Sequence, residues 1–145
     1  MSKNIITLLF LPLFFMACSV EPKPIAYGDD HCQFCDMTVV DKTHSAESTT
    51  KKGKSFVYDA IECLVNDINQ NNNENTMAFI LVADYSKPGQ LTDAKTATFL
   101  ISEKIKSPMG ANLSAFSTKA SAESHLKEFG GQIYDWTALK NKFSK

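Results

Sequence analysis

The sequence lacks an excess of positive charge, and it lacks an apolar run long enough to cross a bilayer. Fifteen basic side chains face sixteen acidic ones, which gives a formal net charge of −1 at pH 7. Such a chain offers no basic field to a phosphate backbone, so we expect no nucleic-acid binding. The apolar stretch at residues 5–16 is shorter than the roughly 20 residues that a membrane-spanning helix needs.

The usual signatures of an enzyme are missing as well. The sequence shows no phosphate-binding glycine loop, calcium loop, paired general acid and base, or nucleophile with an adjacent histidine. We therefore expect no catalytic activity.

Cysteine is scarce, with four in 145 residues. Because only three of them follow Cys18, a closed zinc site of four thiolate or imidazole donors would need both His31 and Cys63.

The N-terminal segment has the pattern of an export signal that ends in a lipidation site. Residues 5–16 are apolar, and the small residue Ala17 comes directly before Cys18 in an order that resembles the bacterial lipobox. An aspartate directly after the lipidated cysteine commonly signals retention in the inner membrane, but here the next residue is Ser19. We therefore favour a periplasmic protein anchored in the outer membrane. The predicted parts are a signal peptide, a lipidated tether and one folded domain, over residues 1–17, 18–25 and 26–140.

The hydrophobic pattern predicts an α+β domain made of two β-β-α-β units, a degenerate duplication. Asp59 is the expected N-cap of the first helix, and Met77–Ala83 is a continuous apolar run typical of a buried strand. In the first unit we expect strands at 37–40, 54–58 and 77–83, with a helix at 60–70. In the second we expect strands at 97–101, 111–116 and 132–136, with a helix from 118 to 129 and a solvated tail from 140.

The chemistry-bearing side chains gather between His31 and Met37. This segment holds two thiols, Cys32 and Cys35, and the thioether of Met37. A Cys-x-x-Cys spacing puts both sulfurs on one side of a tight turn, and a residue two positions further returns to that side if the chain becomes extended. Thiolate and thioether are soft donors that favour Cu(I). The segment therefore predicts a Cu(I) site, with zinc ranked second.

Met109 is a further candidate ligand, because a methionine in the turn sequence Ser-Pro-Met-Gly has no core to fill. Its side chain folding back onto the domain is an equal alternative. Cys63 is expected to be a small buried residue of its helix rather than a ligand. His44 lies in polar sequence and is expected to be exposed.

Two other roles for the pair Cys32 and Cys35 stay open. An oxidising periplasm permits a structural disulfide, although so short a loop stabilises little. A thioredoxin-like redox pair needs the N-terminus of a long helix, whereas a strand is expected to follow here. A thiol-disulfide oxidoreductase and a structural lipoprotein are therefore the alternatives to a metal carrier.

Taken together, the motifs resemble the NosL family of lipoprotein copper chaperones. The matching segments are the lipobox at Cys18, Cys-Gln-Phe-Cys-Asp-Met at 32–37, Phe-Val-Tyr-Asp-Ala-Ile-Glu-Cys at 56–63, and Ser-Pro-Met-Gly at 107–110. Asp36 is a departure, because the family most often has glycine at this position.

The resemblance implies an α+β fold of two β-β-α-β units and periplasmic Cu(I) binding by Cys35 and Met37, then by Met109 and Cys32. It implies a metallochaperone that delivers copper for assembly of the copper-sulfide centre of nitrous oxide reductase. The implied partners are the reductase, a membrane transporter and a periplasmic factor of the same machinery. Lipidation at Cys18 would confine the carrier to a membrane surface.

Overall fold

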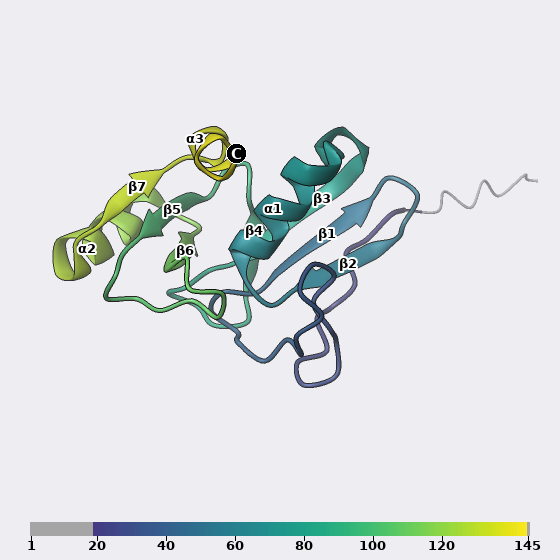
Figure 1. Cartoon of the computed structure of the whole chain (residues 1–145), viewed down its shortest axis with the longest axis horizontal. Coiled ribbons are helices and arrows are strands. Elements are labelled where there is room, and N and C mark those ends of the chain that lie inside the picture. Colours follow the sequence, from purple (N-terminus) through teal and green to yellow (C-terminus); the bar gives the residue numbers. More distant parts are fainter. Residues whose placement is uncertain (1–18, 145) are drawn as a thin grey trace, which may run out of the picture.

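The computed structural model describes residues 19–144, so the predicted signal peptide and the predicted lipidation site at Cys18 lie outside the described part. Two small α+β units lie side by side, and a short helix, α3 (Trp136–Phe143), packs on elements of both (Figure 1). Among the described helices, none combines the length and the apolar character that spanning a bilayer requires.

The first unit is an antiparallel sheet with one helix packed on it. It comprises β1 (Ala46–Thr50), β2 (Ser55–Tyr58), α1 (Ile61–Asn71) and β3 (Met77–Ala83), followed by the edge strand β4 (Leu91–Asp93). The strand order is β2-β1-β3-β4. The helix buries the predicted apolar stripe, which includes Ile61, Leu64, Val65 and Ile68. It ends at Asn72, whose left-handed backbone (φ 47°) is a conformation that asparagine tolerates better than most residues.

The second unit repeats this order of elements. It comprises β5 (Thr98–Ile101), β6 (Leu113–Phe116), α2 (Lys119–Phe129) and β7 (Gln132–Tyr134), in a sheet of order β6-β5-β7. In the first unit β1 lies between β2 and β3, and in the second β5 lies between β6 and β7. All four of these strand pairings are antiparallel. Thr118 accepts a hydrogen bond from the backbone N–H of Ser121 as the N-cap of α2. The two predicted β-β-α-β units are thus confirmed.

The first predicted strand is misplaced. Residues 37–40 form no strand, and Thr38 makes only an isolated bridge with His31. The first strand is β1, a polar sequence in which Glu47 is fully buried. The Glu47 carboxylate accepts hydrogen bonds from the backbone N–H of Lys23 and from the hydroxyl of Thr49. These two contacts supply donors to one oxygen of the buried carboxylate, Oε1, and they help β1 stay buried without the hydrophobic alternation that marks most strands.

The predicted C-terminal end is corrected in part: Asn141, Lys142 and Ser144 are exposed as expected, but residues 136–143 form a helix that packs on the domain. Trp136 is the first residue of α3 rather than the end of a strand, and Leu139 is fully buried. Lys140 forms an ion pair with Glu74, which also accepts a hydrogen bond from the indole N–H of Trp136. Eight residues are too few for a helical period to stand out in the sequence, so this helix shows only through its packing.

The two units share one interior. A cluster of buried apolar side chains draws on both, including Leu64 of α1 and Phe99 of β5. A parallel bridge between Asp84 and Ala115 joins the chain after β3 to β6. The Asp84 carboxylate also accepts hydrogen bonds from the hydroxyls of Ser86 and Ser117. These contacts fix the second unit against the first.

Candidate metal site

The Cys-x-x-Cys segment forms a tight turn held by backbone hydrogen bonds. The N–H of Cys32 donates to the carbonyl of Met37 (2.8 Å), and the N–H of Asp36 donates to the carbonyl of Cys32 (2.9 Å). The N–H of Gln33 donates to the carbonyl of Val57 (2.8 Å), which docks the turn on β2. Both thiols are therefore presented at the point where β2 runs into α1.

The junction between β2 and α1 supplies two further donors. The prediction that Asp59 is the N-cap of α1 is wrong. Ala60 occupies the N-cap position and makes no side-chain hydrogen bond there. Instead the carboxylate of Asp59 accepts a hydrogen bond from the thiol of Cys35 (Sγ to Oδ1, 3.3 Å). Cys63 lies one helical turn further along, in the first turn of α1, and its side chain faces the same thiols.

Four donor atoms converge at this point. One ligand atom from each of Cys32, Cys35, Asp59 and Cys63 lies within 4.8 Å of the other three. Cys32, Asp59 and Cys63 are 1–3% exposed, whereas Cys35 is only partly buried. All three thiols are free. The cluster is thus a largely buried group of three thiols and one carboxylate, in which Cys35 is the most accessible member.

The thiols influence one another's ionisation. Hydrogen bonding from the Cys63 thiol, with help from the backbone N–H groups of Asp59 and Cys35, lowers the pKa of Cys32 to about 6. The same contact raises the pKa of Cys63, and burial raises the pKa of Cys35 to about 11. Cys32 is therefore the thiol of the cluster that ionises most readily to the thiolate, which is the form that binds a metal ion.

The other predicted ligands lie at the surface. The side chains of Met37 and Met109 are 50% and 42% exposed. His31 is exposed, and its Nδ1 lies 3.2 Å from the carbonyl oxygen of Asp36. The four converging donors thus include the predicted Cys32 and Cys35 but not His31.

A buried glutamate ties the turn of Met109 to the helix that carries Cys63. Glu62 is 3% exposed, and its Oε1 accepts hydrogen bonds from the hydroxyl of Ser107 and from the N–H of Ala111 (3.2 Å). The Ser107 oxygen in turn accepts from the N–H of Asn112 (2.9 Å). The loop is therefore clamped on both sides of Met109, while the methionine side chain itself stays exposed.

Comparison with known proteins assigns the family. The NosL family model matches residues 24–144, which is most of the chain. The chain belongs to the NosL family. A search of curated proteins finds no match. The crystal structure of the copper chaperone NosL from Shewanella denitrificans is similar, with a TM-score of 0.71, 20% sequence identity, and coverage of 82% of this chain and 95% of that one. At this identity the likeness shows a shared fold.

The departure at Asp36 is explained by the backbone of the NosL turn. Asp36 has a φ of 64°, in the left-handed region that glycine adopts without strain. Aspartate is among the few other residues that visit this region. The turn therefore keeps the geometry that glycine would give, at a small conformational cost.

Cys63 and Asp59 are the two members of this NosL cluster that the sequence prediction missed. Cys63 is buried as expected, but among thiols rather than only among apolar side chains. Asp59 was assigned to a cap that it does not make. Helical spacing offers no signal for Asp59, because it precedes the extended N-cap Ala60 and lies outside the helix that carries Cys63.

A second polar cluster lies mostly in the interior. His44 is buried, contrary to the prediction, with Nδ1 2.8 Å from the partly exposed Asp41 and Nε2 3.2 Å from the hydroxyl of Ser114. No local pattern indicates that this serine, 70 residues further along, lies beside the histidine. Ser114 has no exposed surface, so no substrate reaches it in this structure. We assign this cluster a structural role between the units.

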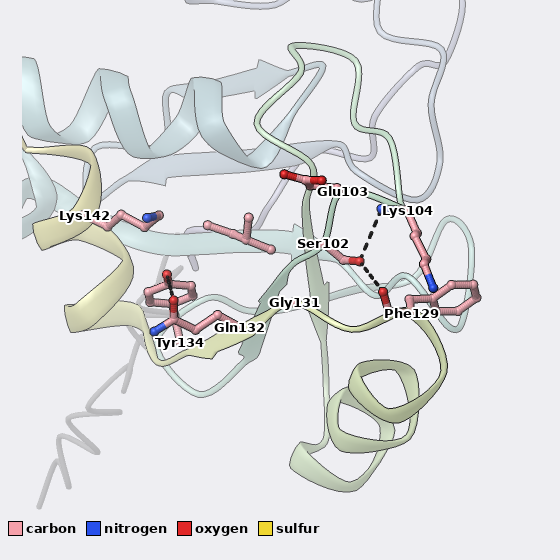
Figure 2. Close-up of a pocket in the computed structure, with 9 residues that line it drawn as sticks. Ser102, Glu103, Lys104, Phe129, Gly131, Gln132, Tyr134 and Lys142 are labelled. Carbon is pink, nitrogen blue, oxygen red and sulfur yellow. Dashed lines mark hydrogen bonds between the residues drawn. The ribbon is translucent and has the colours of Figure 1, made fainter.

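A surface cleft of about 490 Å³ lies in the second unit, away from the thiols (Figure 2). Its lining includes Lys104, Phe129 and Tyr134, but no cysteine or methionine. Ser102 donates a hydrogen bond to the carbonyl of Phe129 at its edge. The cleft therefore adds no donor to the metal site.

Proposed function

We propose that this NosL protein is a copper chaperone that carries Cu(I) on its sulfur donors. The observation that carries the proposal is the convergence of three free thiols from two segments of the chain, of which Cys35 alone is partly exposed. Thiolates are the ligands that Cu(I) prefers, and a few of them suffice. The copper chaperone with the same fold supports this choice of cargo.

The exposed thioethers complete the proposed transfer path. Met37 immediately follows the turn, and Met109 lies in the loop that Glu62 fastens beside Cys63. Neutral donors at the surface can be replaced one at a time by the donors of a partner protein. Copper then passes from one protein to the other by ligand exchange, without release of the free ion. The chaperone itself catalyses no reaction.

The finer parts of the proposal concern the destination of the copper. We propose that it is delivered, together with a membrane transporter and a periplasmic factor, for assembly of the copper-sulfide centre of nitrous oxide reductase. The reductase purified from cells with and without this protein should differ in copper content. Equal copper content would contradict this destination, though not copper binding itself.

We also propose that lipid on Cys18 anchors the protein in the outer membrane, facing the periplasm. The N–H of Lys23 is already bonded to Glu47 of β1, so few residues separate the anchor from the folded domain. From Cys18 to Lys23 a fully extended chain spans about 17 Å, at roughly 3.5 Å per residue. The metal site would then work close to the bilayer. Labelling with a radioactive fatty acid, abolished by Cys18→Ala, tests the anchor.

Titration of Cu(I) into the reduced chain from Ser19 onward, against a coloured chelator, tests the cargo. We expect one tightly bound ion, with affinity strongly reduced in Cys35→Ser and Cys63→Ser and reduced less in Met37→Leu. Met77→Leu is the matched control, because Met77 is a buried residue of β3 and not a proposed ligand. Equal affinity in all variants would refute the ligand set.

The alternative of a thiol-disulfide oxidoreductase rests on the lowered pKa of Cys32, three residues before Cys35. The pair lies in a turn and not at the N-terminus of a long helix. An insulin-reduction assay separates the two functions. Multiple turnovers, abolished by Cys32→Ser, would favour the oxidoreductase.

A further inference from the structure

The turn between β1 and β2 carries a group of lysines that the metal site does not use. Lys51, Lys52 and Lys54 are all exposed, and within residues 19–144 none of them forms an ion pair with a carboxylate. The whole chain has a formal net charge of only −1. Residues 51–54, which we call the lysine turn, are therefore a local concentration of positive charge that favours an anionic partner.

Backbone hydrogen bonds define the conformation of the lysine turn. The N–H of Thr50 donates to the carbonyl of Lys54 (2.8 Å), and the N–H of Gly53 donates to the carbonyl of Thr50 (2.9 Å). Gly53 has a φ of 86°, which glycine adopts without strain. The N–H of Lys51 donates to the carbonyl of Thr76 (2.9 Å), the residue before β3. The lysines thus extend from a backbone that is tied to the first sheet.

A surface hollow of about 530 Å³ lies against the lysine turn. Most of its lining surface is apolar, although three of its side chains end in ammonium groups. Lysine combines these properties, because its methylene stem can cover apolar surface while the ammonium stays in a polar environment. No acidic side chain is among the lining residues, which are Thr50, Lys51, Lys52, Lys54, Asn75 and Thr76. Apolar lining beside ammonium groups suits the boundary between a phosphate headgroup and its lipid.

The lysine turn lies at the end of the first sheet where the described chain begins (Figure 1). Side-chain hydrogen bonds also connect the two segments. The carboxylate of Glu47 accepts from the N–H of Lys23 and from the hydroxyl of Thr49, which lies 2.9 Å from the hydroxyl of Ser55. The N-terminal tether is therefore fastened to the strands that carry the lysine turn, and an anchor on this tether would hold the turn near a bilayer.

We propose that Lys51, Lys52 and Lys54 form a contact site for the phosphate headgroups of anionic phospholipids, which orients the anchored domain on the membrane. The membrane setting rests on the proposed lipid anchor. Each lysine close to an anionic surface adds to the attraction, and a basic patch is a common second signal beside a lipid chain. The tether adds one charge of each sign, at Glu21 and Lys23, so it does not offset the charge of the turn.

This orientation has a consequence for copper transfer. The lysine turn precedes β2, whereas Asp59 and Cys63 of the thiol cluster follow it. From Lys54 to Asp59 an extended chain spans about 16 Å, at roughly 3.3 Å per residue. With the lysine turn on the lipid surface, the thiols lie at the far end of the strand. A partner protein then reaches Cys35 without first displacing lipid.

Partition of the reduced chain from Ser19 onward onto lipid vesicles tests the contact site without the anchor. At low salt we expect binding to vesicles of equal parts phosphatidylglycerol and phosphatidylcholine, and no binding to phosphatidylcholine alone. Each of Lys51→Gln, Lys52→Gln and Lys54→Gln should weaken the binding about fivefold. Added salt should weaken it as well, because salt screens exposed charges.

The matched control removes the same charge at exposed lysines elsewhere. The triple variant of Lys104→Gln, Lys127→Gln and Lys142→Gln should bind the anionic vesicles nearly as well as the unaltered chain. Equal losses in the control and in the triple variant of the lysine turn would overturn the site, because net charge alone would explain them. Equal binding to neutral vesicles would overturn it too. Absence of binding to the anionic vesicles would refute a lipid partner and favour an acidic protein.

Amine labelling of the lipidated chain in the same vesicles tests the orientation. A neutral acylating reagent should modify the three lysines of the turn several-fold more slowly in anionic than in neutral vesicles, while Lys127 of α2 reacts equally in both. Equal rates for the lysine turn would overturn the proposed orientation. Failure of Cys18 to take up fatty acid would instead refute the anchor alone, since the partition experiment does not use it.

Discussion

Replacing Glu62 by alanine should destabilise the fold and detach the turn of Met109 from the thiol cluster. The carboxylate accepts two hydrogen bonds, from the hydroxyl of Ser107 and the N–H of Ala111, and its second oxygen is buried without a partner. A hydrogen bond to a charged group contributes about 1.5–3 kcal/mol, and an unpaired buried oxygen costs about 1–3 kcal/mol. From the middle of these ranges, the loss of two bonds and the removal of one unpaired oxygen leave about 2.5 kcal/mol of destabilisation.

Urea denaturation measures this change as a lower transition midpoint with an unaltered slope. Glu62→Gln keeps an acceptor oxygen and should cost less than half as much. Glu128→Ala, an exposed glutamate on α2, is the matched control and should change the unfolding free energy by less than about 0.5 kcal/mol. A Glu62→Ala variant as stable as the control would show that the clamp contributes nothing.

The same variant tests whether Glu62 positions Met109. If Glu62 holds the turn so that the Met109 thioether can bind copper, Glu62→Ala should lose as much Cu(I) affinity as Met109→Leu. We expect each loss to be about tenfold. The double variant should then lose little more than either single one, because both changes remove one interaction. Additive losses would refute this reasoning, since they would mean that the two residues act independently.

Three further predictions concern residues outside the cluster. Asp36→Gly relieves a left-handed backbone (φ 64°) and should raise the unfolding free energy by about 0.5 kcal/mol in urea titrations; a clear loss of stability would contradict the strain. Burial alone would raise the pKa of Asp84, but hydrogen bonds from Ser117 and Ser86 hold it below its usual value. The stabilisation from Asp84 should therefore be complete above the unfolded pKa of about 3.9 and be lost as pH falls through the folded pKa. Asp84→Asn should flatten this acid limb of a stability–pH curve, and an unchanged limb would exclude the effect. Leu139→Ala should cost about 2–4 kcal/mol in thermal or urea unfolding, because the side chain is fully buried; a neutral result would mean that α3 is not part of the cooperative unit.

Several elements were predictable because their signal is local. The apolar stripe of α1 and the unbroken run of β3 are properties of consecutive residues, and β3 spans the predicted Met77–Ala83. The limits of α2 follow from Thr118 at its start and Gly130 at its end, which act through neighbouring backbone groups. The tight spacing of Cys32 and Cys35 likewise needs no distant contact to bring two sulfurs together.

Other elements were not predictable because distant contacts decide them. In the polar strand β1, the buried Glu47 accepts hydrogen bonds from Lys23 and Thr49, and the first of these contacts spans 24 residues. The helix α3 is held by Glu74, far earlier in the chain. A local pattern cannot register a partner that many residues away, so propensity gave the wrong answer for both segments.

The donor chemistry can be read from consecutive residues, since the family motifs and the soft side chains lie in short segments of the chain. Which donors meet depends on how those segments pack. Cys63 and Asp59 join Cys32 and Cys35 because docking of the turn on β2 brings it against the start of α1. The physical reason is that donor type belongs to a single residue, whereas convergence within 4.8 Å depends on how separate segments pack.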